Sequence, residues 1–396
     1  MNTPEEQFIS RAQRNRGMKP QKIKQKSSLT AGKVIRRVLL CLGTLIVCAV
    51  IAVAATCNVL LKSGCEPLKV KLVLSATQAS ATKWAPGLFI PQSEVDRIVA
   101  ESHMTTTDEM SLEEYSAIIE EAEAEAEDKW ADAIDGMILE IVHGPTFTGY
   151  LLSIKDPSRV FIGTASDDFK NCTEGMRIFK AVDRENAVAA INGGEFQDPG
   201  GVGVGNQPMG LTYSRGKCVW NDGLKRTFIG FDENNRLIVR ESMTKAEADA
   251  LHIRDAISFQ NDNTLITNET DAEGNITNVK VLYADNNTGT AQRTSIGQTA
   301  DGTVLLLVTD GRSASSLGAT RNDVIELMVE RGAVSAGMLD GGSSSMMLYR
   351  GYYDKYPELF DKSKLDEYQL QGLVNKYKAF TTPRRMPTFI CVSNEG

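Results

Sequence analysis

An uncharged apolar segment near the N-terminus constrains this chain more than any other feature. No charged residue occurs between Arg37 and Lys62. As a helix, Val38–Leu61 would span about 36 Å, enough to cross the hydrocarbon core of a bilayer. We therefore predict a transmembrane signal anchor over residues 34–61. A cleaved signal peptide is the alternative, but its apolar region is usually shorter and its basic region is rarely this long.

The residues that flank this segment predict its orientation. Ten Lys and Arg residues precede residue 38, and such clusters stay on the cytoplasmic side of a membrane. Residues 1–33 are polar and have no apolar periodicity, so we predict a disordered basic cytoplasmic tail. The remainder of the chain would then lie outside the cell, held at the cell membrane by a single pass. A lipidated Cys57 is a minor alternative.

Composition and charge narrow the function classes. The chain has 42% hydrophobic and 24% charged residues, which is ordinary for a globular protein. Its net charge of -8 offers no basic surface for nucleic acid, so we predict no nucleic-acid partner. The predicted outer part contains Cys65, Cys172, Cys218 and Cys391. Disulfides can form there, but the sequence leaves disulfides and free thiols equally open.

Residues 62–136 predict an acidic helical stalk. Within it, Ser111 and Glu114 have the spacing of a capping box, at the start of a segment in which apolar residues recur at helical spacing and glutamates cover the other face. A solvated spacer helix explains this pattern. A coiled-coil dimer is the alternative, although its seam would be short and rich in alanine.

Residues 137–396 predict an α+β domain: a mixed β-sheet with flanking helices. Short β-branched or aromatic runs alternate with Gly, Pro and Asp, as strands and turns do. The predicted strands are GMILEIVHG, FTGYLLSIKD, RVFIGTA, NAVAAIN, MGLTYS, KCVW, RTFIGF, RLIVR, DGTVLLLVTD, VSAGMLD, SSMMLYR and PTFICVS. One helix is predicted over 321–331, with Thr320 and Asp323 at its start and Gly332 at its end. A second is predicted over 357–379.

Polar and small residues directly follow three strongly apolar strands. These segments are Asn192-Gly193-Gly194-Glu195-Phe196, Asp310-Gly311-Arg312 and Asp340-Gly341-Gly342-Ser343-Ser344-Ser345. A buried strand that ends in a carboxylate and glycines brings charge and bare backbone to a ligand. One such segment could be a simple turn. Three of them, together with Arg293 and the pair Arg384-Arg385, indicate a site.

These motifs resemble the phosphodiester glycosidase family. The segments that carry the resemblance are INGGEF, QRTSIGQTADGTVLLLVTDGR, LGATRNDVIELMVERGAVSAGMLDGGSSSMML and RRMPTFICV, in that order. The resemblance covers about residues 137–396 and does not include the predicted anchor and stalk. It implies a hydrolase that cleaves a sugar from a phosphodiester, as in the animal lysosomal uncovering enzyme, which acts on N-acetylglucosamine, and in bacterial proteins of exopolysaccharide or cell-wall metabolism. The family usually has an aromatic residue or Asp at the position of Glu195.

Residue by residue, the resemblance implies an active site that contains Asn192, Gly193, Arg293, Asp310, Asp340, Gly341, Gly342, Ser343 and Arg385. Arginine binds phosphate oxygens in a bidentate manner, so Arg293 and Arg385 are our candidates for the anion site, and the N–H groups of Gly341 and Gly342 could add donors. Paired carboxylates commonly serve glycosidic cleavage. Asp340 and Glu195 are the predicted acid–base pair, with Asp310 third.

Several residues also have a purely structural interpretation. Asp310 could cap a turn, Arg312 is expected at the surface or in a salt bridge, and one arginine of the pair 384–385 is expected in solvent. No cofactor is predicted, although a carboxylate-bound Mg²⁺ or Ca²⁺ ion is left open because its ligands have no fixed spacing.

Other functions compete with this prediction. A serine hydrolase at Gly-Gly-Ser-Ser-Ser needs a base, and the only histidines are His103, His143 and His252. Three scattered histidines without Cys-x-x-Cys provide no zinc-ligand spacing. The serious alternative is a non-catalytic, membrane-tethered glycan-binding or scaffold protein of the cell envelope. The sequence does not identify the natural sugar or the group attached to its phosphate.

Overall fold

The computed structural model describes residues 31–62, 66–77, 82–100, 106–110, 115–117, 130–198, 203–271, 273–283, 289–313, 316–355, 362–377 and 382–394. The chain divides into two compact units, residues 1–58 and 59–396.

Helix α2 (Ala31–Lys62) contains the predicted anchor. Within it, Val34–Lys62 is long and apolar enough to cross a membrane, and the side chains of its most apolar stretch are not buried inside the protein. A signal sequence can have the same length and composition, so the mode of membrane association remains a prediction. The predicted tail, residues 1–33, lies almost entirely outside the described residues.

The segment predicted as a stalk is only partly helical. It begins with two helices, α3 (Glu66–Thr77) and α4 (Gln92–Ala100), joined through the short 3₁₀ helix η2 (Pro86–Leu88). The chain then forms a strand, β1 (Thr106–Met110), where a helical stalk was predicted. This strand pairs with a strand of the following domain, because an extended segment can satisfy its backbone groups at an open sheet edge. The predicted capping box at 111–114 lies outside the described residues.

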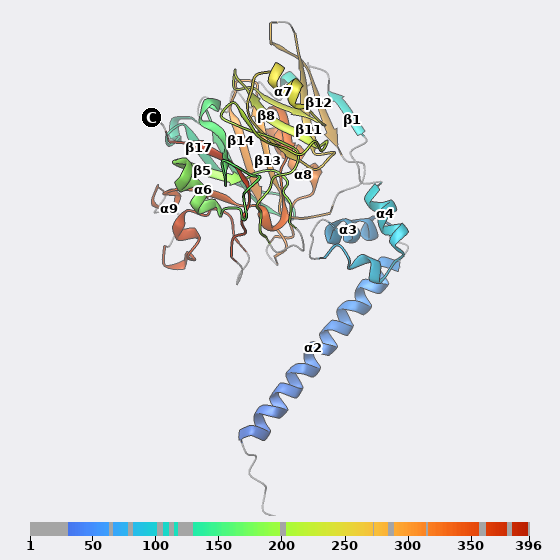
Figure 1. Ribbon diagram of the computed structural model, residues 1–396. Helices are drawn as coiled ribbons and strands as arrows, with labels where there is room; N and C mark the ends of the chain where they lie inside the picture. Colours follow the sequence, from blue (N-terminus) through green and yellow to red (C-terminus); the bar gives the residue numbers. More distant parts are fainter. Residues whose placement is uncertain are drawn as a thin grey trace, which may run out of the picture. The chain divides into compact units, whose positions relative to one another are not determined.

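Three antiparallel sheets form the body of the second unit (Figure 1). In spatial order, the eight-stranded sheet contains β1, β12 (Ile276–Tyr283), β11 (Thr264–Thr270), β15 (Ala333–Met338), β13 (Thr294–Thr299), β14 (Val304–Thr309), β3 (Thr148–Ile154) and β2 (Met137–His143). The five-stranded sheet contains β7 (Lys217–Asn221), β6 (Leu211–Ser214), β10 (Ile253–Phe259), β8 (Thr227–Asp232) and β9 (Leu237–Arg240). The four-stranded sheet contains β16 (Met347–Tyr349), β5 (Ala187–Asn192), β17 (Thr388–Ser393) and β4 (Val160–Thr164). The predicted α+β class is confirmed, and every strand pair among the described residues is antiparallel.

One hydrophobic cluster contains side chains from all three sheets. Leu152, Ile191 and Ile257 belong to it, and each comes from a different sheet. Strand β14 is buried along its whole length, because its alternate side chains enter two cores: Leu306 faces the other sheets and Leu307 faces helix α8 (Arg321–Glu330). A strand covered on both faces reads as a continuous apolar run, which is why this strand could be predicted.

Helices cover the outer faces of two sheets. Helix α8 packs on β12 and β15, and α6 (Ile178–Glu185) packs on β5 and β17 (Figure 1). The predicted start of α8 is confirmed by a complete capping box: Thr320 Oγ1 accepts from the N–H of Asp323 at 3.1 Å, and the Asp323 carboxylate accepts from the N–H of Thr320 at 2.7 Å. The short helix α7 (Lys245–Ala250) lies between β9 and β10 in the chain.

The second predicted helix, over 357–379, is wrong where the structure describes it. In the described parts of residues 352–377, the helical segments are the one-turn helix α9 (Tyr352–Lys355) and the 3₁₀ turns η7 (Lys362–Lys364) and η8 (Gln369–Gln371). The chain instead makes strand-like hydrogen bonds beside β16, since Gly372 accepts from the N–H of Tyr349 at 2.8 Å and Met347 accepts from the N–H of Val374 at 2.8 Å. Tertiary pairing therefore overrides the local helical pattern here.

Candidate active site

The ends of strands from two sheets meet at the side chain of Asn192, the last residue of β5. Asn192 is fully buried. Its Nδ2 donates to the carbonyl of Asp340 at 2.6 Å, and its Oδ1 accepts from Thr294 Oγ1 at 2.9 Å and from the N–H of Met346 at 3.1 Å. The predicted convergence of Asn192 and Asp340 is therefore present. The side-chain amide of Asn192, however, already makes its hydrogen bonds to other residues of the protein. Its role is therefore to hold these segments together.

The two glycines after Asn192 let the backbone there lie close to three other segments of the chain. The N–H of Gly193 donates to the carbonyl of Thr388 at 3.0 Å, and its carbonyl accepts from the N–H of Asp340 at 3.3 Å. A Cβ on Gly193 would lie 2.4 Å from Thr388 Oγ1, and one on Gly194 would lie 2.2 Å from the carbonyl oxygen of Ser258. No side chain fits at either position, which explains the glycine pair.

Asp340 begins the loop that follows β15. Burial raises the pKa of its carboxyl group to about 6, and the negative charge of Glu195 acts in the same direction. The Ser344 side chain and the Arg384 guanidinium oppose this shift because both favour the ionised form. A half-buried carboxyl group that titrates near pH 6 is suited to proton transfer at physiological pH.

The loop after Asp340 folds into the 3₁₀ turn η6 (Gly342–Ser344). Gly342 has a φ of +62°, a conformation that favours glycine. Its N–H donates to the carbonyl of Gln292 at 2.9 Å, and Gln292 Nε2 donates to the carbonyl of Gly311 at 3.0 Å. Gln292 thus ties the segment around Asp310 to the loop of Asp340. Gly341 approaches the same carbonyl of Gln292, since a Cβ there would lie 2.9 Å from it.

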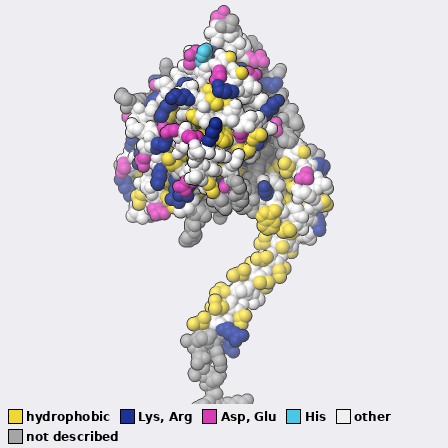
Figure 2. Space-filling model, viewed as in Figure 1, with side chains coloured by type: hydrophobic (Ala, Val, Ile, Leu, Met, Phe, Trp, Pro, Cys, Tyr) yellow, Lys and Arg dark blue, Asp and Glu magenta, His cyan; other side chains and the backbone are white. Residues whose placement is uncertain are grey.

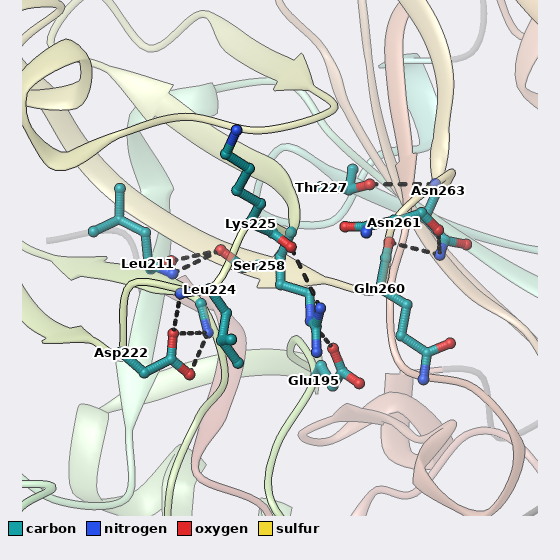
Figure 3. A network of polar contacts seen from close by, with 12 residues as sticks. Glu195, Leu211, Asp222, Leu224, Lys225, Thr227, Ser258, Gln260, Asn261 and Asn263 are labelled. Atoms are coloured by element: carbon teal, nitrogen blue, oxygen red, sulfur yellow. Dashed lines mark hydrogen bonds and ion pairs between the residues drawn. The ribbon is translucent and has the colours of Figure 1, made fainter.

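Glu195 forms an ion pair with a residue that the motifs did not indicate. Its Oε2 accepts from Arg226 Nε at 2.7 Å, and 16% of the Glu195 side chain and 22% of the Arg226 side chain are exposed. The backbone N–H of Glu195 donates to the carbonyl of Ser258 at 2.9 Å. Figure 3 shows Glu195 beside Ser258 and the loop that carries Asp222 and Lys225. The predicted proximity of Glu195 and Asp340 agrees with the electrostatic coupling of their carboxyl groups.

The structure assigns different surroundings to the two arginines of the basic pair. Arg384 donates from Nη1 to Ser343 Oγ at 2.9 Å, pairs with Asp198 and lies 5.1 Å above the ring of Phe196. Arg385, the predicted anion ligand, pairs instead with Glu174 at 3.1 Å, and 44% of its side chain is exposed. Of the two, Arg384 is therefore the one that acts on Asp340.

Arg293 is buried with its donors turned toward backbone. Its Nε donates to the carbonyl of Ala319 at 3.1 Å and its Nη2 to that of Gly289 at 2.6 Å. Burial, with Arg321 and Arg312 nearby, lowers the pKa of Arg293 to about 9. These bonds brace the entry into β13, which leaves Arg293 a weaker candidate for binding an anion than its sequence position suggested.

Arg312, expected at the surface, lies beside the glycine loop. A Cβ on Gly342 would lie 3.9 Å from Arg312 Nη1. Its Nη2 is buried and has no hydrogen-bond partner within the part of the chain that the structure describes. The backbone of Arg312 is in the left-handed region, with φ +55°, which is uncommon for a residue with a side chain. Two guanidinium groups therefore flank the Asp340 loop: that of Arg312 lies near Gly342, and that of Arg384 donates to Ser343.

Both carboxylate oxygens of Asp310 accept hydrogen bonds from other residues of the protein. Its Oδ2 accepts from the hydroxyl of Tyr150 at 3.1 Å, and its Oδ1 accepts from the N–H of Lys376 at 3.1 Å. Burial raises the pKa of Asp310 to about 6, and these two hydrogen bonds partly oppose the rise. Both oxygens are engaged, so the cap-like interpretation of Asp310 fits this geometry better than a catalytic one.

A model of the phosphodiester glycosidase family matches residues 185–393, which include Asn192 and its partners Thr294, Asp340 and Met346. The chain belongs to the phosphodiester glycosidase family.

The relatives of this chain are distant or match only in part. It is 43% identical over 61 residues to the uncharacterised prophage-derived protein YomE of Bacillus subtilis, which is 15% of this chain and spans 10% of the length of YomE. It is similar to the zebrafish N-acetylglucosamine-1-phosphodiester alpha-N-acetylglucosaminidase catalytic domain, auto-inhibited by its pro-peptide, with a TM-score of 0.49 and 15% identity over 73% of this chain and 88% of that one. A protein from Burkholderia pseudomallei gives a TM-score of 0.39 and 15% identity over 76% and 88% of the two chains.

The sequence left both metal ligands and disulfides open. In the described ranges, no group of three or more His, Cys, Asp or Glu side chains could hold a metal ion. The expectation that no cofactor is needed stays a prediction. Cys172, Cys218 and Cys391 are free thiols, while Cys65 lies outside the described residues.

The motifs did not indicate two residues that contact Glu195 or the Asp340 loop. Arg226 carries no motif, and it reaches Glu195 only because β8 and the strand end at Ser258 are neighbours in space. Gln292 lies next to Arg293 in the segment that resembles the family, so the resemblance could have indicated it. Arg384 was considered as one of a pair, and sequence alone could not separate it from Arg385.

Proposed function

We propose that this chain hydrolyses the glycosidic bond of a sugar 1-phosphodiester at the outer surface of the cell membrane. Its family membership supports a hydrolase that acts on phosphodiester glycosides. The apolar helix α2 supports anchoring by one membrane pass, with the catalytic domain outside. The substrate class that fits this location is a glycophosphate of the cell envelope, such as an exopolysaccharide or cell-wall polymer with an N-acetylglucosamine-type sugar.

The observation that carries the proposal is the loop of Asp340 between two guanidinium groups. Arg312 lies beside Gly342, and Arg384 donates to Ser343. A phosphodiester has two non-bridging oxygens that share one negative charge, and a planar guanidinium group can donate to both of them. The buried, unpartnered Nη2 of Arg312 supports a ligand at this place, because a buried charged donor is costly without an acceptor.

The carboxylates suggest the division of chemical roles. A phosphate monoester is a good leaving group, so the reaction has little need of a general acid. We infer that Asp340 acts as general base: it accepts a proton from water while the water oxygen attacks the anomeric carbon. The bond between that carbon and the phosphate oxygen breaks, and its electron pair leaves with the phosphate monoester. Glu195, held by Arg226, would stabilise the positive charge that develops on the sugar ring.

The test compares two adjacent arginines in the full chain reconstituted in nanodiscs. Release of free N-acetylglucosamine from N-acetylglucosamine-1-phosphodiesters is measured for Arg384→Ala and Arg385→Ala. We expect Arg384→Ala to lower kcat/KM by about 10- to 100-fold, since a hydrogen bond to a charged group contributes roughly 1.5 to 3 kcal/mol. Arg385→Ala, at an exposed ion pair, should change it by about 2-fold or less.

Two results would contradict the proposal. Wild-type protein that releases no sugar from a panel of such diesters, yet binds the glycans, would indicate a binding protein. Equal losses for the two arginine variants would remove the role given to Arg384.

A further inference from the structure

A small helical lobe directly follows the apolar helix. Leu61, in the last turn of α2, is 6% exposed and belongs to one hydrophobic cluster with Val73 of α3 and with Val95 and Ile98 of α4. Only three residues, 63–65, separate the end of α2 from the start of α3. Because four steps of an extended chain reach at most about 14 Å, a bilayer that contains α2 would have the lobe near its surface.

The lobe exposes two large apolar side chains in one short segment. Trp84 is 62% exposed and Leu88 is 69% exposed, whereas Ile90 is buried in the lobe's own cluster. Two successive turns fix this segment: the N–H of Ala85 donates to the carbonyl of Thr82 at 2.9 Å, and the N–H of Leu88 to that of Ala85 at 3.1 Å. Figure 2 shows hydrophobic side chains on the lobe. The two turns fix the backbone that carries Trp84 and Leu88, whose side chains are exposed to solvent.

The charge of the lobe fits an anionic lipid surface. Residues 59–100 contain five Lys and Arg residues against three Asp and Glu residues, although the whole chain has a net charge of -8. Lys83 precedes Trp84, and Lys62 ends α2. Tryptophan is enriched where bilayer and water meet, and each Lys or Arg near an anionic membrane adds favourable attraction.

We propose that Trp84 and Leu88 insert into the headgroup region of the bilayer that holds α2, with Lys62 and Lys83 against lipid phosphates. This inference rests on the membrane anchoring in the proposed function, and it does not depend on the reaction. We call this lobe, residues 59–100, the foot, because it would then rest on the membrane surface. An anchor helix joined to a flexible stalk would instead let the domain move away from the membrane.

The foot contacts the catalytic domain close to the site. Ser75 Oγ of α3 accepts from the N–H of Thr290 at 3.1 Å, and Gly289 lies so close that a Cβ there would be 2.1 Å from the N atom of Ser75. Gly289 in turn accepts from Arg293. A foot on the lipid would therefore hold the catalytic domain near the membrane, which favours glycophosphates that lie close to the bilayer over distant polymer.

The test uses the tryptophan itself. The full chain, with Trp130 and Trp220 replaced by Phe so that Trp84 is the sole tryptophan, is reconstituted into vesicles of phosphatidylcholine and phosphatidylglycerol with brominated acyl chains. We expect these lipids to quench the emission of Trp84 by about half, because bromine quenches only tryptophans that enter the bilayer interface. The matched control, with Trp220 as the sole tryptophan, should not be quenched.

A second variant separates insertion from mere proximity. Leu88→Asp in the chain that retains only Trp84 should reduce the quenching and shift the emission to longer wavelength. Co-flotation of the protein with the vesicles measures membrane anchoring. Sugar release in the same vesicles measures the reaction separately. Equal quenching of the chains that retain Trp84 and Trp220 would refute insertion of the lobe. Protein that does not float with the vesicles would refute the membrane anchoring on which that insertion rests.

Discussion

Replacing Asp340 by Asn should stabilise the protein while it removes activity. The pKa of this carboxyl group is raised from its ordinary 3.8 to about 6, first of all by burial. The folded state therefore holds a proton that the unfolded chain releases at a lower pH. At about 1.4 kcal/mol for each pH unit, ionising Asp340 costs the folded state about 3 kcal/mol. This is an upper limit, because the residue is not wholly shielded from water.

The sign of the pH dependence follows from this difference. Between about pH 4 and pH 6 the folded state binds more protons at this site than the unfolded state, so the free energy of unfolding falls as the pH rises. Asn carries no charge at any pH and avoids that loss. We expect Asp340→Asn to be more stable than the wild type by up to about 3 kcal/mol at pH 8, and by only about 1 kcal/mol at pH 4.5.

Guanidinium chloride unfolding of the chain in detergent, followed by tryptophan fluorescence at both pH values, measures this difference. Asp132→Asn, at an exposed position, is the control and should change stability by about 0.5 kcal/mol or less. Sugar release should fall by about 100-fold or more, as expected for loss of a general base. The reasoning is refuted if Asp340→Asn is less stable at pH 8, or if its advantage is the same at both pH values.

Three further substitutions test the surroundings of this carboxyl group. Asn192→Ala leaves a buried N–H and a carbonyl of the 340–346 loop without their partners, so chemical unfolding should show a loss of about 2 to 6 kcal/mol; a loss below 1 kcal/mol would contradict the bracing role. Gly194→Ala places a Cβ 2.2 Å from a Ser258 carbonyl oxygen, and thermal unfolding should show destabilisation of about 1 to 3 kcal/mol; an unchanged Tm would be inconsistent with this packing. Glu195→Gln removes a charge that raises the pKa of Asp340, so the acidic limb of the kcat/KM profile should move to lower pH; a move to higher pH would exclude the coupling.

Local patterns in the sequence were sufficient for much of the architecture. The apolar span, the capping box of α8 and the strongly apolar strands could be predicted because each is written in consecutive residues. Strands β10, β11, β12 and β13 were not predicted as separate strands. Their segments carry polar residues, and Thr294–Thr299 also contains glycine, so they become strands through pairing with neighbours such as β8 and β15.

The candidate site divides in the same way. The sequence by itself determined that carboxylates and glycines follow buried strands, since strand, turn and polar residue are adjacent in the chain, and it thereby indicated Asp340 and Glu195. Only the tertiary structure decided which of the predicted arginines lies beside the Asp340 loop. Arg293 bonds to backbone carbonyls, Arg385 turns to Glu174, and Arg384 reaches Ser343. The direction of a long side chain depends on acceptors supplied by distant segments, and these come together only when the sheets pack.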